Sequence, residues 1–158
     1  MIFVTVGMQL PFDRLIRAVD EIAPEVGEEI IAQTQRSVYM PRHIKTIDYL
    51  SSIEYSDLMR RARLIISHAG AGTIISALML KKPIIIMPRR VSLGEHRSDH
   101  QLEFSKRMNE LHYVHVAYDD RQLRTLVLDS RIRYLKELGT TGLYSLISSL
   151  RNFILNTE

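Results

Sequence analysis

The sequence predicts an α/β fold in which helices cover both faces of a parallel β-sheet. Short apolar segments without polar alternation, such as residues 64–66 and 83–87, are typical of strands that are buried on both faces. Segments with apolar residues at helical spacing separate them along the chain. The chain has 158 residues, 46% of them hydrophobic, which fits one domain spanning residues 1–158 with a full core.

The expected elements alternate from one end of the chain to the other. Strands are expected at residues 2–6, 29–34, 44–49, 64–66, 83–87 and 112–116. A first helix should begin near Pro11 and stop at Pro24 and Gly27. Further helices are expected at residues 52–61 and 72–80, after a polar loop at 88–98, and from Asp119 onward. Residues 143–156 should form an amphipathic C-terminal helix, whose apolar stripe packs on the sheet or docks on a partner.

Composition excludes several classes of protein. The chain has no cysteine, which rules out a disulfide scaffold and thiolate chemistry. A strand follows Met1 directly and no apolar run approaches a membrane span, so we expect neither a signal peptide nor a transmembrane helix. The net charge is +3, and the clustered arginines are either solvated or in contact with an anionic partner. No aromatic residues are interleaved with them, which argues against a nucleic-acid partner.

Three polar segments follow predicted strands and should meet at one edge of the sheet. They are residues 7–9, 67–73 and 95–101. Ligands of open parallel sheets bind at the carboxyl ends of the strands, where the strand order reverses. We therefore expect one ligand site built from these three segments.

The middle segment, residues 67–73, is the most specific of the three. It runs from a buried strand into a helix, and Gly70 and Gly72 allow the backbone to approach a ligand closely. Free N–H groups in the first turn of a helix favour a phosphate, and His68 and Thr73 can add side-chain donors. Taken alone, the segment also fits a tight strand-to-helix turn whose glycines serve packing.

Other kinds of site fit less well. A dinucleotide fingerprint begins at Gly70, but Ile75 stands where its last glycine is required, and no acidic residue closes the second strand. The P-loop pattern is absent. His96, Asp99 and His100 could suggest a metal, but no cysteine accompanies them, and an ordinary polar loop at the start of a helix explains them better. We expect neither a metal nor a cofactor.

Together, the three segments resemble a known family. Residues 1–13, MIFVTVGMQLPFD, residues 66–74, ISHAGAGTI, and residues 99–103, DHQLE, are similar to the C-terminal, donor-binding domain of glycosyltransferase family 28. The resemblance extends to about residue 118 and is closest to stand-alone versions of this domain. These are bacterial exopolysaccharide subunits similar to rhizobial glucuronosyltransferases, and the catalytic subunit that adds the second N-acetylglucosamine to dolichol-linked chitobiose. It implies a Rossmann-like sheet that forms half of a GT-B fold.

The resemblance also implies a UDP-sugar site and its residues. Gly7 and Gln9 would lie near the diphosphate or the sugar, and Tyr49 and Leu50 would meet the uracil. The residues implied for the phosphates are His68, Gly70, Ala71, Gly72 and Thr73. Those implied for the sugar hydroxyls are Asp99, His100 and Gln101.

Two positions depart from the family pattern, and two arginines extend it. Met8 replaces a common serine or threonine, and Ser76 stands where many relatives carry an acidic residue that binds the ribose hydroxyls. A serine cannot accept both hydroxyls as a carboxylate does. Arg89 and Arg90 follow the fifth predicted strand, near the expected sugar site, and either can pair with a carboxylate. Such a pair would favour UDP-glucuronate as the donor.

The resemblance implies half of an enzyme. The chain has room for one of the two GT-B domains, so the acceptor site is expected on a membrane-anchored partner subunit that holds this chain at the cytoplasmic face of the membrane. The implied reaction is inverting, metal-free transfer of a hexose or glucuronic acid from a UDP-sugar to a lipid-diphosphate-linked acceptor in exopolysaccharide biosynthesis. A UDP-sugar epimerase-like half and a non-catalytic nucleotide-binding regulator stay open as alternatives.

Overall fold

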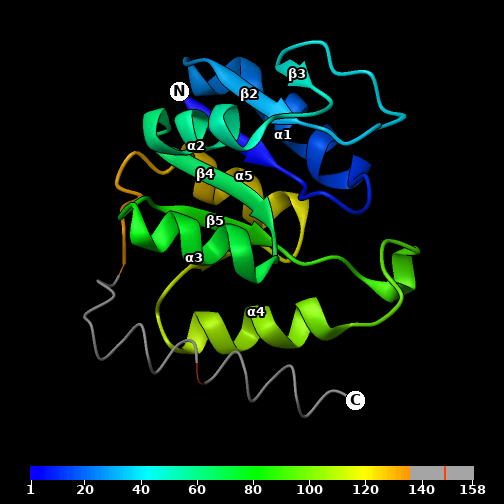
Figure 1. Ribbon diagram of the computed structural model, residues 1–158, viewed down its shortest axis with the longest axis vertical. Coiled ribbons are helices and arrows are strands. Elements are labelled where there is room, and N and C mark those ends of the chain that lie inside the picture. The colour runs from blue at the N-terminus through cyan, green and yellow to red at the C-terminus, as the bar shows by residue number, and fades with distance from the viewer. Residues whose placement is uncertain (136–147, 149–158) are drawn as a thin grey trace.

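The computed structural model describes residues 1–135 and residue 148, which contain a six-stranded, parallel β-sheet (Figure 1). The strands are β1 (Ile2–Thr5), β2 (Ile30–Gln33), β3 (Lys45–Ile47), β4 (Leu64–His68), β5 (Ile84–Met87) and β6 (His115–Val116). Their order in the sheet is β3-β2-β1-β4-β5-β6. This order reverses direction between β1 and β4, so the topological switch point lies at the carboxyl ends of these two strands. The predicted parallel α/β fold is confirmed.

Helices cover both faces of the sheet, as predicted. They are α1 (Asp13–Val26), α2 (Ser52–Arg61), α3 (Ala71–Met79), the short 3-10 helix η1 (Val91–Leu93), α4 (His100–Glu110) and α5 (Asp120–Leu128). Helices α1 and α5 share one apolar core with Ile2 and Val4, whereas α2, α3 and α4 share the other with Phe3 (Figure 1). Alternate residues of β1 thus enter opposite cores, which requires a strand that is apolar throughout.

Some element boundaries differ from the predictions. Helix α1 continues through Pro24 and ends before Gly27, whose φ of 68° gives the left-handed cap that terminates it. The last strand is restricted to His115–Val116, because His112, at a positive φ of 57°, belongs to the turn that follows α4. The predicted helix at residues 143–156 lies outside the described residues, apart from residue 148. Each helix in the described part of the chain is too short or too polar to cross a bilayer.

Candidate functional site: a cleft at the switch point

A cleft of about 530 Å³ is formed by the loops that follow β1, β4 and β5 and by the start of α4. It brings together the three segments that the sequence predicted to meet. The predicted site residues that line it are Gly7, Gln9, His68, Gly70, Ala71, Gly72, Thr73, Arg89, His100 and Gln101. The cleft therefore has the position that a ligand of an open parallel sheet takes.

Helix α3 presents an uncapped amino terminus to this cleft. Its N-cap is Gly70, which has no side chain to accept hydrogen bonds from the first-turn N–H groups. Ala71, Gly72 and Thr73 all line the cleft. Among the described residues, the space that a Cβ of Gly72 would fill is open, so a ligand can approach the backbone there. The helix terminus is suited to binding a phosphate through its N–H groups and its dipole.

His68, at the end of β4, lies between two glycines. A Cβ on Gly70 would lie 2.2 Å from His68 Nε2, and a Cβ on Gly7 would lie 2.5 Å from His68 Cε1. Gly7 also has a φ of +80°, which strains any residue with a side chain. Gly70 was predicted to allow close approach of a ligand, but Gly70 and Gly7 are required first to make room for the imidazole.

The imidazole of His68 is neutral at pH 7. Burial, together with the charge of Arg89, lowers the pKa of His68 to about 4, against a hydrogen bond to the Thr5 backbone that raises it. Ser67 Oγ lies 3.3 Å from His68 Nδ1. His68 therefore adds no positive charge to the cleft, and its one ring N–H donates to the Thr5 carbonyl.

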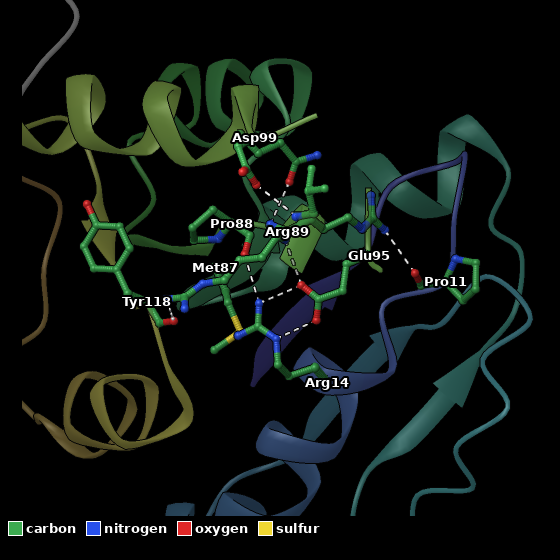
Figure 2. A network of polar contacts seen from close by, with 11 residues as sticks. Pro11, Arg14, Met87, Pro88, Arg89, Glu95, Asp99 and Tyr118 are labelled. Atoms are coloured by element: carbon green, nitrogen blue, oxygen red, sulfur yellow. Dashed lines mark hydrogen bonds and ion pairs between the residues drawn. The ribbon is translucent and has the colours of Figure 1, made fainter. Parts of the chain in front are cut away.

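Arg89 joins two of the loops that form the cleft (Figure 2). Its Nη2 donates to the carbonyl oxygens of Val6 at 3.0 Å and of Leu10 and Pro11, which fixes the loop after β1. Its backbone N–H donates to Gln101 Oε1 at 3.1 Å, which fixes the start of α4. Burial lowers the pKa of Arg89 to about 10, so the guanidinium still carries its charge at pH 7. Its Nε is buried and has no hydrogen-bond partner among the described residues.

Four of the predicted site residues do not line the cleft, namely Tyr49, Leu50, Arg90 and Asp99. Arg90 Nη2 donates to the Tyr118 carbonyl at 2.6 Å, and the structure does not place Arg90 at the predicted sugar site (Figure 2). Asp99 Oδ1 accepts a hydrogen bond from the Val91 N–H at 2.9 Å. Asp99 thereby fastens η1 to the start of α4.

A second hollow, of about 390 Å³, adjoins the cleft. The residues that line both are Gly7, Met8 and Thr73. Tyr49 and Leu50, the predicted contacts of the base, line this second hollow. So does Ser76, whose Oγ donates to the Gly72 carbonyl at 2.9 Å. The structure thus places the predicted base-side residues and phosphate-side residues in two neighbouring spaces.

Several residues that build the site were missed from the sequence. His96 lines the cleft beside His100. Tyr55 donates its hydroxyl hydrogen to Thr73 Oγ1 at 3.2 Å, and Gln33 Nε2 donates to the Gly7 carbonyl at 3.3 Å. The role of Gln33 could have been predicted from the sequence, because a polar residue at the end of a buried strand needs a hydrogen-bond partner.

The loop between β5 and α4 is anchored by an ion pair to α1. Arg14 Nε lies 2.6 Å from Glu95 Oε1, and Arg14 Nη2 lies 2.9 Å from Glu95 Oε2 (Figure 2). The same carboxylate accepts from the Arg90 N–H at 3.0 Å. The two side chains are only 19% and 13% exposed. No sequence spacing links these partners, which lie 81 residues apart.

The positive charge that could attract an anion to the cleft comes from protein groups. Arg89 and the terminus of α3 contribute it directly. Within the described residues, no group of three or more His, Asp or Glu side chains is arranged to hold a metal ion. An anion in the cleft would therefore interact with backbone N–H groups, imidazoles and one buried guanidinium.

The comparison with known families decides the identity of the domain. The model of the glycosyltransferase family 28 C-terminal domain matches residues 1–137. The chain belongs to this family. Its sheet is the Rossmann-like half of a GT-B fold, so the resemblance seen in the three motifs is confirmed.

Family 28 relatives match most of this chain, but the chain matches only part of them. It is 24% identical over 133 residues to the UDP-N-acetylglucosamine transferase subunit ALG13 of Yarrowia lipolytica, covering 75% of this chain and 65% of that protein. It is 31% identical over 96 residues to the UDP-N-acetylglucosamine--N-acetylmuramyl-(pentapeptide) pyrophosphoryl-undecaprenol N-acetylglucosamine transferase of Prochlorococcus marinus, covering 59% of this chain and 24% of that protein. The chain thus spans less than two-thirds of either relative.

A solved structure of ALG13 has the same fold as this family 28 domain. The two align with a TM-score of 0.63 at 21% identity, over 92% of this chain and 93% of that chain. The alignment shows that the two chains share this fold over most of their lengths.

Proposed function

We propose that this chain is the UDP-sugar-binding subunit of a two-component glycosyltransferase. The observation that carries the proposal is the cleft itself, in which the uncapped terminus of α3 meets the loop after β1 and the start of α4. In this arrangement the diphosphate binds the N–H groups of α3, and the sugar extends toward His100 and Gln101. The nucleoside occupies the neighbouring hollow beside Tyr49 and Leu50.

The proposed reaction is transfer with inversion at the sugar C1. An acceptor hydroxyl attacks C1 from the face opposite UDP, the bond from C1 to the β-phosphate oxygen breaks, and UDP leaves with the electron pair. Negative charge grows on the β-phosphate during this step. The N–H groups of α3 and the buried charge of Arg89 are placed to stabilise it without a metal.

The proposal assigns the acceptor to a second subunit. A membrane-anchored partner would bind the acceptor, take up its proton and hold this chain at the cytoplasmic face of the membrane. The name of the Prochlorococcus marinus relative includes a pyrophosphoryl-undecaprenol acceptor, which supports a lipid-diphosphate-linked acceptor here. Exopolysaccharide biosynthesis is the proposed pathway, on the resemblance of the three motifs.

The transferred sugar is proposed to be a hexose or glucuronic acid, and Arg89 is the residue that would distinguish them. Arg90 is bonded to Tyr118, whereas Arg89 lines the cleft. An arginine N–H that meets a carboxylate forms a charge-assisted hydrogen bond. We expect UDP-glucuronate to bind about tenfold tighter than UDP-glucose, as one such bond allows.

The donor preference is tested by the ratio of two affinities. Arg89→Lys keeps a positive charge but removes the planar set of guanidinium N–H donors, so the preference for UDP-glucuronate should fall toward unity even where both affinities decrease. Equal affinities of the wild-type chain for the two donors would reject glucuronate and leave a neutral hexose.

The binding function itself is tested by titration calorimetry with UDP and a panel of UDP-sugars. We expect binding by the wild-type chain and a loss of about tenfold in His68→Ala, which removes an imidazole that lines the cleft. His43→Ala, an exposed histidine on the loop before β3, is the matched control and should bind like wild type. Absence of UDP binding at millimolar ligand would reject the proposed function for this chain.

A further inference from the structure

His96 and His100 form a pair of imidazoles on the wall of the cleft. Their ring centroids lie 4.6 Å apart at an interplanar angle of 72°, and both residues line the cleft together with the first turn of α3. His96 comes from the loop that follows η1, and His100 is the first residue of α4. The cleft thus has two imidazoles on a different element from the helix terminus that the phosphate is proposed to bind.

One serine holds both rings. The Ser98 backbone N–H donates to His96 Nδ1 at 3.3 Å, so in the neutral ring the hydrogen of His96 is on Nε2. Ser98 Oγ lies 2.6 Å from His100 Nδ1. When this hydroxyl donates, His100 also carries its hydrogen on Nε2. Both imidazoles then have an Nε2–H that Ser98 does not use.

The charge of His96 opposes protonation of His100. Burial and then this charge lower the pKa of His100, while Glu103, three residues further along α4, raises it. With ring centroids 4.6 Å apart, two protonated rings would repel each other.

The charged groups around the pair leave room for an anion. His68, on β4, is neutral at pH 7, and Arg89, after β5, is positive. Of the nearby carboxylates, Glu95 binds Arg14 and Asp99 accepts from the loop at η1, whereas Glu103 is exposed. Arg97, between the two histidines in the sequence, is exposed.

We propose that His96 and His100 clamp the diphosphate of the donor on the side next to its sugar, and that the pair takes up a proton when the donor binds. The proton goes to His100 Nδ1, where the Ser98 hydroxyl can turn to accept it. This inference rests on the proposed UDP-sugar function. A negative charge within about 4–6 Å of an imidazole favours its protonated form by 1–3 pK units. Donor binding would thus relieve the repulsion between the rings, and the protonated pair would stabilise the charge that grows on the leaving UDP.

Calorimetry of an intact UDP-sugar measures this proton directly. The probe is the tightest binder among UDP-N-acetylglucosamine, UDP-glucose and UDP-glucuronate, because free UDP has a terminal phosphate that itself titrates near pH 6. The dependence of the binding enthalpy on the ionisation enthalpy of the buffer, at pH 7, gives the number of protons taken up. We expect roughly half a proton per donor, and an affinity about tenfold weaker at pH 8.5 than at pH 6.

Substitutions test whether the proton taken up on donor binding is bound by His96 and His100. His96→Ala and His100→Gln should each abolish most of the proton uptake, and should weaken binding about five- to tenfold at pH 6 but less than twofold at pH 8.5. Ser98→Ala should reduce the uptake as well, because it releases His100 while the backbone still holds His96. His43→Ala is the matched control, with unchanged uptake.

The outcomes separate this inference from the function on which it rests. If the chain binds neither UDP nor any of the UDP-sugars, the proposed function fails. If a UDP-sugar binds without proton uptake, or with an uptake that survives in His96→Ala/His100→Gln, the inference is overturned and the proposed function stands. An uptake that disappears only in His68→Asn would overturn it equally, because the proton would then belong to His68.

Discussion

The cleft and the neighbouring hollow share three residues but are built in different ways. The cleft depends on buried groups, since His68 fits between two glycines and Arg89 is only 3% exposed. The hollow is bordered by Tyr49, which is 67% exposed, and by Ser76, whose hydroxyl bonds its own helix. The phosphate side is thus fixed by the fold, whereas the nucleoside side relies on surface side chains.

The difference follows from what each part of a UDP-sugar needs. A diphosphate is bound by donors that are already oriented and partly desolvated, because reorganising them on binding would cost affinity. The nucleobase can be bound by an exposed aromatic side chain that stacks on it. We therefore expect substitutions in the cleft to affect both folding and binding, and substitutions in the hollow to affect binding alone.

The largest effect is expected for Gly70→Ala. The φ of −91° and ψ of 125° at Gly70 suit alanine, so the new Cβ acts only through its 2.2 Å approach to His68 Nε2. We expect a loss of about 1–3 kcal/mol in the free energy of unfolding, as for an overpacked site, and at least a tenfold loss of UDP affinity. Denaturant unfolding and calorimetry measure the two effects.

A matched control and a rescue accompany this variant. Gly72→Ala adds the same methyl group two residues later, where the space is open among the described residues, and should fold as stably as wild type. The double variant Gly70→Ala/His68→Ala should recover most of the stability lost by Gly70→Ala, because it removes the ring that clashes. Equal stabilities of Gly70→Ala and Gly72→Ala would contradict the packing of His68 between the glycines.

The next largest effect is a loss of stability in acid through His68. Its folded pKa of about 4 lies below the ordinary 6.5, so the unfolded chain binds the proton more tightly and folding weakens as pH falls through this range. His68 should account for about 3 kcal/mol of the stability lost between pH 7 and pH 4.

A non-titrating variant isolates this contribution. His68→Asn should lose correspondingly less stability between pH 7 and pH 4 in denaturant titrations. Burial alone would raise the pKa of Asp20, but the Arg42 and His43 N–H groups and the Tyr39 hydroxyl lower it below 3.8, so its own loss occurs at lower pH. Parallel pH profiles for wild type and His68→Asn would show that the ring is not held in its buried, neutral state.

Sequence reasoning predicted the layers of the fold and the three loops of the site, because both follow from local patterns. Apolar strands and the Gly70–Thr73 turn have signatures within a few residues. What it missed lies in long-range pairs. The contact between Arg14 and Glu95 joins residues 81 positions apart, and the directions of Arg89 and Arg90 depend on carbonyl groups of other loops. The sequence alone cannot show which of the two neighbouring arginines, Arg89 or Arg90, lines the cleft, because this depends on tertiary packing.

A smaller effect is expected where the loop between β5 and α4 is anchored. Glu95→Gln weakens a half-buried pair with Arg14, and we expect it to cost about 2 kcal/mol of stability, less than a fully buried pair would. Donor affinity should fall about threefold, because the loop that carries His96 loses its ion pair with α1.

Asp57→Asn is the control. It breaks the exposed pair with Arg61 and should cost under about 0.5 kcal/mol of stability. Similar costs for the two variants in denaturant unfolding would show that Glu95 does not hold the loop.

The smallest effect on folding, and the only gain in affinity, is expected in the hollow. Ser76→Asp places a carboxylate where the hollow is lined by a hydroxyl, and a carboxylate can accept hydrogen bonds from both ribose hydroxyls. We expect UDP to bind about three- to tenfold tighter, with a change in stability within about 0.5 kcal/mol. Ser76→Asn is the matched control, since its amide has one accepting oxygen and no charge, and it should gain less. A fall in affinity for Ser76→Asp in calorimetry would mean that the carboxylate meets the diphosphate, and the base and ribose would then have to lie outside the hollow beside Tyr49.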